Sequence, residues 1–232
     1  MAAGKYYAVK RGKRTGVFDN WEACRASVEG VSGAEYKSFR TYAEAECYLG
    51  RCGQPAKADS GGEELPAPGT LLAYVDGSYD HSLRKYAFGC VFICPDGRVY
   101  IKYGNGDNEQ SLQQRNVAGE MLGAMYAVRT AMASGFSRVE ICYDYEGIEK
   151  WVTGSWRART ELTQKYAASM RSWGKKIAIF FTKVAAHTNV YYNELADKTA
   201  KTGLREGNGI PGIISLEDYG EDEVWHGTNA VE

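Results

Sequence analysis

The sequence lacks the long apolar segments that mark membrane and secreted proteins. No window of its 232 residues offers the roughly 18 consecutive apolar positions that a membrane-spanning helix needs. The opening segment, MAAGKYYAVKRGKRTG, has no apolar run long enough for a secretory signal. These absences predict a cytoplasmic protein with no membrane partner.

Cysteine and proline are also scarce. Six cysteines would be few for a disulfide scaffold of this length, and a reducing compartment suits unpaired thiols. The pairs Cys47/Cys52 and Cys90/Cys94 lack a second pair or a nearby histidine at zinc-ligand spacing, so a zinc site is disfavoured. Three of the five prolines fall within residues 51–69, among glycines and mixed charges. That composition predicts a flexible linker.

Net charge is small, at −1, and by itself predicts no nucleic-acid partner. The charges are unevenly distributed, however. Residues 1–18 carry several basic side chains and no acidic one, whereas residues 205–232 are rich in aspartate and glutamate. Local charge is therefore a better guide to partners than the sum. We expect the acidic tail, 205–232, to be a solvated and flexible end.

The linker divides the sequence into a head, residues 1–50, and a body, residues 70–204. The hydrophobic fraction of 44% and the charged fraction of 25% are ordinary for a folded protein. The head combines short alternating segments with helical patterns, which predicts a small α+β domain with a thin core. Its expected elements are strands at 6–9 and 17–18, a helix at 21–30 capped by Asn20, a strand at 35–39 and a helix at 42–50.

The body begins with three strand patterns and continues with helices that alternate with two more strands. This order predicts an α/β fold, a mixed five-stranded sheet with helices packed on it. The long helix that begins near Val117 has one apolar stripe. The expected strands are 71–75, 86–94, 98–104, 138–144 and 177–184, and the expected helices are 117–132, 146–151, 160–173 and 191–203.

Four carboxylates of the body stand out by position. Asp76 and Asp144 each follow the apolar part of a strand, Glu120 lies in the first turn of the long helix, and Asp197 lies in the last helix. Each also has a purely structural explanation. Asp76 and the next glycine form a hairpin signal, and Asp144 suits a helix cap. The helix dipole favours Glu120 near a helix N-terminus, and Asp197 is spaced to pair with a lysine one turn on.

Taken together, these positions favour a metal site. Adjacent parallel strands would bring Asp76 and Asp144 together, and Glu120 lies three residues after Val117 on the side that faces the sheet. Carboxylates gathered in this way repel one another unless a cation joins them. Hard oxygen ligands suit Mg²⁺, and two such ions about 4 Å apart form a standard clamp for phosphodiester hydrolysis.

Four motifs cover the whole length of the body: YVDGS at 74–78, RNVAGEMLG at 115–123, ICYDYEG at 141–147 and AHTNVYYNELADKTAK at 186–201. In these motifs the body resembles ribonuclease H of type 1. The resemblance implies a five-stranded mixed sheet and assigns Asp76, Glu120, Asp144 and Asp197 to the metal-binding carboxylates of the family.

Two further residues match functional positions of this family. His187 corresponds to a histidine on a flexible loop that assists proton transfer or product release, and its ordinary pKa range suits that task. Asn116 corresponds to a residue that contacts the duplex in the minor groove, although a helix N-cap would also explain it.

The head resembles the small hybrid-binding domain found at the N-terminus of many members of this family. The resemblance places Tyr7, Trp21, Tyr36 and Lys37 on nucleic-acid contact positions. Aromatic rings can lie against sugars or bases while the basic turn meets phosphates. A core position is the alternative for Trp21. Ser38 stands where relatives often have a second lysine, which predicts weaker phosphate contact.

Two features of the body add to this comparison. Glu146 stands where the family commonly has a polar amide. Residues 150–176 are strongly basic and carry three tryptophans, which favours duplex contact over a merely solvated helix surface.

The resemblance implies an endonuclease that hydrolyses the RNA strand of RNA–DNA hybrids and leaves 3′-hydroxyl and 5′-phosphate ends. The implied cofactor is a pair of Mg²⁺ ions, with Mn²⁺ as a substitute, and no obligate protein partner is indicated. Two alternatives remain open: a hybrid or duplex-RNA binder without activity, and another nuclease or transposase on the same fold. The presence of all four carboxylates disfavours the first, and the head together with the HTNVYYNELAD segment disfavours the second.

Overall fold

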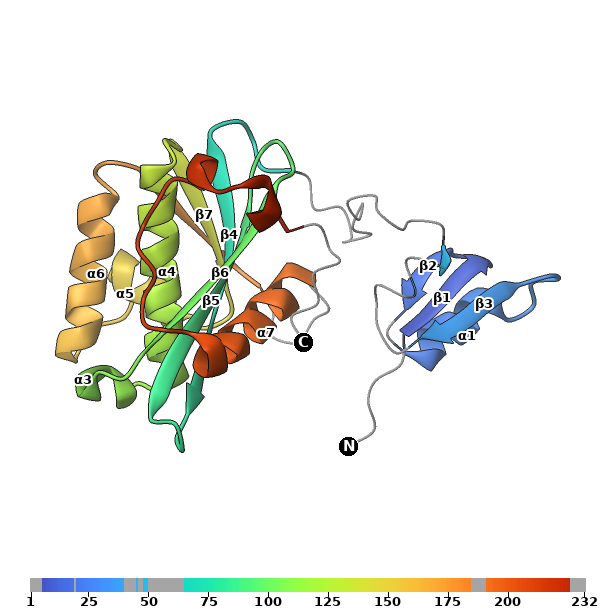
Figure 1. The fold of residues 1–232 in the computed structure, drawn as a ribbon, viewed down its shortest axis with the longest axis horizontal. Coiled ribbons are helices and arrows are strands. Elements are labelled where there is room, and N and C mark those ends of the chain that lie inside the picture. The colour runs from blue at the N-terminus through green and yellow to red at the C-terminus, as the bar shows by residue number, and fades with distance from the viewer. Residues whose placement is uncertain are drawn as a thin grey trace. The chain divides into compact units, whose positions relative to one another are not determined.

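The computed structural model describes residues 6–18, 20–39, 45, 48–49, 65–184 and 191–225, and its contacts divide the chain into two compact units (Figure 1). The smaller unit holds the N-terminal residues, and the larger unit holds Glu63–Trp225. Most of the predicted linker lies outside the described residues. Within those residues, no helix combines the length and apolarity that crossing a membrane requires.

The smaller unit is a three-stranded antiparallel sheet with a helix, as predicted. Asn20 caps the helix, since its side chain accepts a hydrogen bond from the backbone N–H of Ala23 at 2.8 Å. The predicted helix at 42–50 lies largely outside the described residues. The strands follow the order β2-β1-β3, and the elements are β1 (Tyr6–Arg11), β2 (Gly16–Phe18), α1 (Trp21–Val28) and β3 (Glu35–Phe39).

The larger unit contains the predicted five-stranded mixed sheet, in the order β6-β5-β4-β7-β8. The first three strands in the chain pair antiparallel, and β7 and β8 then add to β4 in parallel. The central strand β4 therefore has an antiparallel neighbour on one side and a parallel neighbour on the other. The strands are β4 (Thr70–Asp80), β5 (Lys85–Ile93), β6 (Val99–Gly106), β7 (Arg138–Tyr143) and β8 (Ala178–Lys183).

Helices cover both faces of this sheet. Figure 1 shows α4, α5 and α6 on one side and α7 on the other. Successive strand residues alternate between the faces, so Val75 of β4 packs on the α4 side and Tyr74 packs against Ala196 and Tyr192 of α7. The helices are α3 (Glu109–Leu112), α4 (Asn116–Ala133), α5 (Gly147–Thr153), α6 (Glu161–Trp173) and α7 (Tyr191–Glu206).

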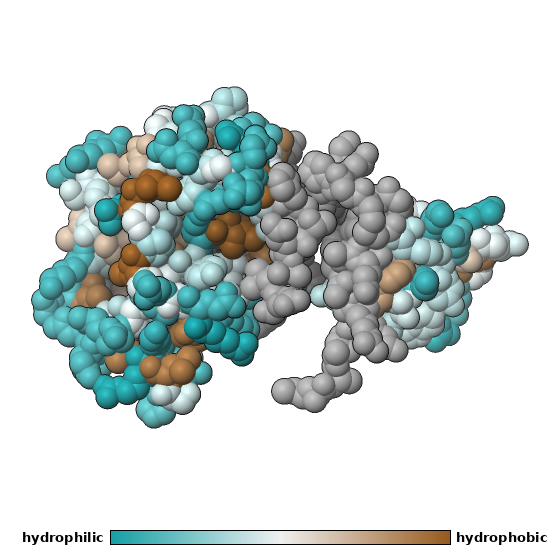
Figure 2. Space-filling view, viewed as in Figure 1, coloured by the Kyte–Doolittle hydropathy of each residue, from teal (hydrophilic) through white to brown (hydrophobic). Residues whose placement is uncertain are grey.

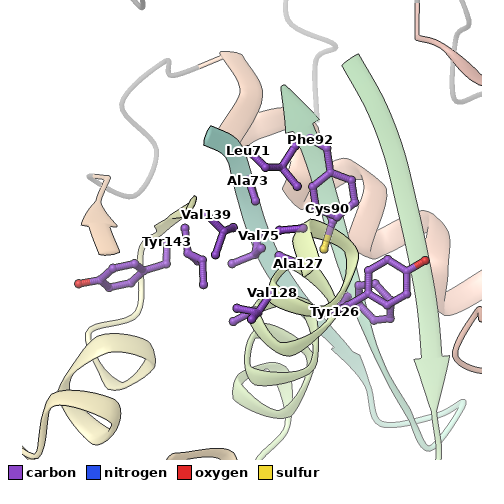
Figure 3. Packing of buried hydrophobic residues seen from close by; sticks show 14 of the residues in the cluster. Leu71, Ala73, Val75, Cys90, Phe92, Tyr126, Ala127, Val128, Val139 and Tyr143 are labelled. Atoms are coloured by element: carbon purple, nitrogen blue, oxygen red, sulfur yellow. The ribbon is translucent and has the colours of Figure 1, made fainter. Parts of the chain in front are cut away.

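The main core lies between α4 and the sheet, where the predicted apolar stripe of the long helix meets the strands (Figure 3). Met121, Ala124 and Val128 of that stripe are buried. Cys90 and Cys94 are buried thiols, whereas Cys47 and Cys52 lie outside the described residues. On the surface visible in Figure 2, the apolar patches of the larger unit are small and separated by polar side chains.

Strand β4 is longer than expected and does not turn at Asp76. It continues to Asp80, which pairs with Lys85 of β5. The hairpin explanation for Asp76 and Gly77 is therefore wrong. The turn comes at the residues after Asp80, whose side chain accepts hydrogen bonds from the backbone N–H groups of Ser82 and Leu83.

Residues 207–225, here called the tail segment, pack on the larger unit and do not form the flexible end that their charge suggested. Leu216 and Val224 are buried, and Val224 forms an isolated β-bridge with Tyr100 of β6. The acidic side chains between them face solvent. Burial of the few apolar residues outweighs the charge, because the acids stay hydrated while the backbone runs along the sheet edge.

Candidate active site

Three carboxylates meet where the central strands β4 and β7 separate. Each of Asp76, Glu120 and Asp144 offers an oxygen within 4.8 Å of the other two, and we call these three residues the carboxylate cluster. The parallel ladder ends with Tyr74 opposite Cys142. Asp76 and Asp144 each lie two residues further along, so the register places them side by side.

Glu120 reaches the cluster from α4 because that helix lies directly on β4. A Cβ atom at Gly77 would stand 2.9 Å from Cγ of Glu120 and would overlap backbone atoms of Asn116 and Glu120. Only glycine allows this approach. Glu120 is the fifth residue of α4, one position past the first turn that we had expected it to occupy.

Burial and mutual repulsion perturb the cluster strongly. Burial first, and then the charge of Asp144, raises the pKa of Asp76 to about 7, although the N–H of Gly77 donates to its Oδ1 at 2.6 Å. Burial, followed by the charges of Asp144 and Asp76, raises the pKa of Glu120 to about 9. Among the described residues, Oε2 of Glu120 is buried without a hydrogen-bond partner. A divalent cation would satisfy that oxygen and relieve the repulsion, so the donor set fits a hard metal ion.

Asp197 lies near the cluster but outside the group of three. It is on α7, where Lys201 donates to its Oδ2 at 2.6 Å, so the ion pair considered from the spacing is present. Its charge adds a smaller contribution, after burial and the charge of Asp144, to the raised pKa of Asp76.

Of the two further residues matched to the family, the structure describes Asn116 but not His187. Asn116 is the first residue of α4, while Arg115 occupies the N-cap position, so the cap explanation for Asn116 is wrong. Its Nδ2 lies 3.5 Å from Oε1 of Glu120. His187 lies outside the described residues. Asp144 is not a helix cap either, because Glu146 holds that position before α5.

In the smaller unit, three aromatic side chains form what we call the aromatic face: Tyr7, Trp21 and Tyr36. The Trp21 ring centroid lies 5.5 Å from that of Tyr7 and 5.8 Å from that of Tyr36. Trp21 is 43% exposed and Tyr36 is 44% exposed, so the core alternative for Trp21 is wrong. Lys37 is the next residue of β3 and points to the other face, over the ring of Phe39.

The basic segment after the cluster contains both paired and exposed groups. Glu146 is bound by Lys150 and Lys183, and these contacts lower its pKa to about 2. Lys150 also lies over the ring of Trp156, which is 38% exposed. The residue that departs from the family pattern therefore ties the start of α5 to the end of β8.

The fold and the cluster define a class of α/β protein with an acidic, metal-compatible site at the end of its central strands. The RNase H family model matches residues 68–205, and the model of the ribonuclease H1 N-terminal domain matches residues 5–49. Ribonuclease H1 of Homo sapiens is 34% identical over 258 residues, which span 88% of this chain and 90% of its own length. Ribonuclease H1 of Mus musculus is 26% identical over 263 residues, which span 88% and 90%.

Among solved structures, RNase H1 from the halophilic archaeon Halobacterium salinarum aligns with a TM-score of 0.47 and 24% identity, covering 58% of this chain and 97% of that one. The two family models and the human relative identify the chain: it belongs to the ribonuclease H1 family and is an endoribonuclease. The family predicted from the motifs is thereby confirmed.

Proposed function

We propose that this endoribonuclease hydrolyses the RNA strand of RNA–DNA hybrids with the help of two divalent metal ions. The observation that carries the proposal is the carboxylate cluster, in which Glu120 lies beside two aspartates and its buried Oε2 has no hydrogen-bond partner in the described part of the chain. Asp76, Glu120, Asp144 and Asp197 would hold the ions. Mg²⁺ is the favoured ion because all the donors are carboxylate oxygens, and Mn²⁺ would substitute.

The bound ions would supply an activated water and stabilise the leaving oxygen, which corresponds to 3′-hydroxyl and 5′-phosphate products. The protein positions the donors in advance. The Gly77 N–H fixes one oxygen of Asp76, and the close approach of α4 fixes the backbone of Glu120. His187 would move a proton or assist product departure, as its match to the family motif implies.

The smaller unit would bind the hybrid without taking part in the chemistry. Its exposed aromatic face suits contact with sugars or bases, and Lys37 with the basic turn after β1 suits phosphates. Asn116 would contact the minor groove beside Glu120. Recognition of 2′-hydroxyl groups across a shallow minor groove needs shape and not base sequence, so we expect little sequence preference.

A gel assay tests this function. Labelled hybrid, duplex DNA and duplex RNA are each incubated with Mg²⁺, Mn²⁺ or a chelator, and the ends of the products are mapped. We expect cleavage of the RNA strand in the hybrid alone, with either ion and not with the chelator. Binding without cleavage would favour the inactive binder, and cleavage of duplex DNA would favour another nuclease of this fold.

A further inference from the structure

Gly89 of β5 lies directly opposite Asp76 in the antiparallel ladder. Directly opposed residues of two antiparallel strands point to the same face of the sheet. Tyr74, two residues before Asp76, packs against α7, so Asp76 and position 89 both lie on the face that α7 covers. The strand residue beside Asp76 on this face therefore has no side chain.

Helix α7 lies directly on this bare stretch of backbone. A Cβ atom at position 89 would stand 2.5 Å from the backbone nitrogen of Ala200 and 3.0 Å from the carbonyl carbon of Thr199, and it would overlap the oxygen of Ala196. These are backbone atoms of a helix, which cannot rotate aside as the end of a long side chain can. A side chain at position 89 would therefore displace this turn of α7.

The turn that contacts Gly89 is the one that carries Asp197. Asp197 follows Ala196 directly, and its negative charge contributes to the raised pKa of Asp76 on β4. The far end of α7 is fixed separately, because Nδ2 of Asn105 donates to the carbonyl oxygen of Gly203 at 2.9 Å. Added bulk at position 89 would thus tilt the helix and move the turn that bears Asp197 away from the sheet.

We infer that Gly89 is a positioning residue, which sets the distance between Asp197 and the carboxylate cluster by letting α7 rest on the backbone of β5. The inference rests on the proposed function, because it takes Asp197 as a ligand of the ions. Gly89 touches neither the substrate nor the ions. It acts through the helix.

Gly89→Ala tests the inference. Displacement of Asp197 by about 1 Å should lower kcat roughly 10²-fold, the size of effect that such misplacement causes, while KM for the hybrid stays unchanged. Titration with MnCl2 in the presence of a non-cleavable hybrid should show roughly 10-fold weaker binding of the ion that Asp197 holds. Gly123→Ala is the matched control, since its Cβ would lie at an ordinary 3.4 Å from its nearest neighbour on the α4 face, and this variant should keep kcat and Mn²⁺ affinity.

A compensating variant distinguishes displacement of Asp197 from a non-specific disturbance of the fold. If α7 has moved outward, Asp197→Glu should restore part of the lost kcat and Mn²⁺ affinity in the Gly89→Ala background, although it impairs the otherwise unchanged protein. If the losses of kcat and Mn²⁺ affinity in the two single variants simply add in the double variant, the inference is wrong. If Gly89→Ala does not fold, Gly203→Ala decides, because its Cβ would press α7 more gently, at 3.3 Å from backbone oxygens of β5 and β6. Unchanged kcat and Mn²⁺ affinity in that variant would also overturn the inference.

Results that refute the proposed function differ from results that refute the role of Gly89. Asp197→Asn with normal Mn²⁺ affinity and normal kcat would remove Asp197 from the ligands, and the same result for Asp76→Asn would remove the proposed site. Loss of both in Asp197→Asn, together with a fully active and folded Gly89→Ala, would refute only the role of Gly89.

Discussion

Asp76 and Glu120 are acids whose pKa values, about 7 and about 9, lie well above their ordinary range because they are buried beside other carboxylates. Without metal, the native state therefore holds protons that the unfolded chain has already released. Stability rises with pH only where the unfolded state binds more protons, so here it must fall as pH increases. The loss begins above the unfolded pKa values, near 4, and continues to about pH 9.

Asp76→Asn should flatten this dependence. Thermal melts of the chelated protein at pH 5, 7 and 9 should show a melting temperature that falls with pH in the unchanged protein and falls less in the variant. The asparagine removes one titrating group and part of the repulsion on Glu120. Added Mg²⁺ should raise the melting temperature of the unchanged protein more than that of the variant. Parallel curves without metal would contradict the pKa assignment.

The same substitution should abolish most of the activity. Asp76→Asn keeps the shape of the side chain and removes a charged ligand, so cleavage of the hybrid should fall by orders of magnitude. Binding of the hybrid should survive, because phosphate contacts elsewhere supply most of the affinity. Glu140→Gln on β7 is the control, since Glu140 accepts a hydrogen bond from Thr182 and is not one of the three clustered carboxylates. Near-normal turnover of Asp76→Asn would rule out its role as a ligand.

A milder loss is expected at His187. If this side chain moves a proton or assists product departure, His187→Ala should lower turnover by roughly 10²-fold at most and leave Mn²⁺ binding intact. His81→Ala provides a control, because His81 is exposed and, among the described residues, its ring is hydrogen-bonded only to the hydroxyl of Tyr79. An unfolded or metal-free His187 variant would show a structural role.

At the scale of elements, the residue patterns predicted strand and helix order well, because the central strands contain short apolar runs and both α6 and α7 have one buried and one exposed side. The predictions were wrong where one local residue pattern is compatible with two structures. Asp76 and Gly77 look like a hairpin turn, yet the glycine is there because α4 lies on it. No local pattern could reveal that contact, since it depends on how a distant helix packs.

The tail segment shows the opposite error, in which average composition hid a few decisive residues. Its acids suggested a solvated end, but Leu216 docks beside α4, and its backbone N–H donates to Oγ of Ser134 at 2.9 Å. Helix α7 ends at Glu206, directly before Gly207, and the chain then returns along the sheet edge. Charge predicts solvation of side chains and says little about the backbone that carries them.

Leu216→Ala should therefore destabilise the larger unit. Truncation of a buried leucine typically costs about 2–5 kcal/mol, with the larger values where the site cannot collapse, and denaturant unfolding can measure this loss. Ile214→Ala is the matched control, because Ile214 is 43% exposed and should cost little. Activity of the folded fraction on a short hybrid should be unchanged, since the tail segment contributes no clustered carboxylate. Equal stabilities of the two variants would show that the tail does not contribute to the fold.

At the scale of the whole molecule, the chain combines two units with different proposed tasks. The larger unit holds the carboxylate cluster, and the smaller one holds the exposed aromatic face. A flexible linker of the length predicted for residues 51–69 has an end-to-end distance of roughly 25 Å. A hybrid bound by the smaller unit would then stay near the active site at an effective concentration of about millimolar.

Removal of residues 1–53 should consequently raise KM on long hybrids while kcat changes little, the signature of lost ground-state binding. The salt dependence of binding should flatten, because the phosphate contacts of the basic turn after β1 and of Lys37 are lost. Trp21→Ala should reproduce much of the KM effect and leave the salt slope unchanged, since it removes stacking surface and no charge. Steady-state kinetics at several salt concentrations measures KM, kcat and the salt dependence. Loss of kcat on a saturating short hybrid would instead mean that the smaller unit belongs to the catalytic machinery, because a tethered clamp adds affinity without touching the chemical step.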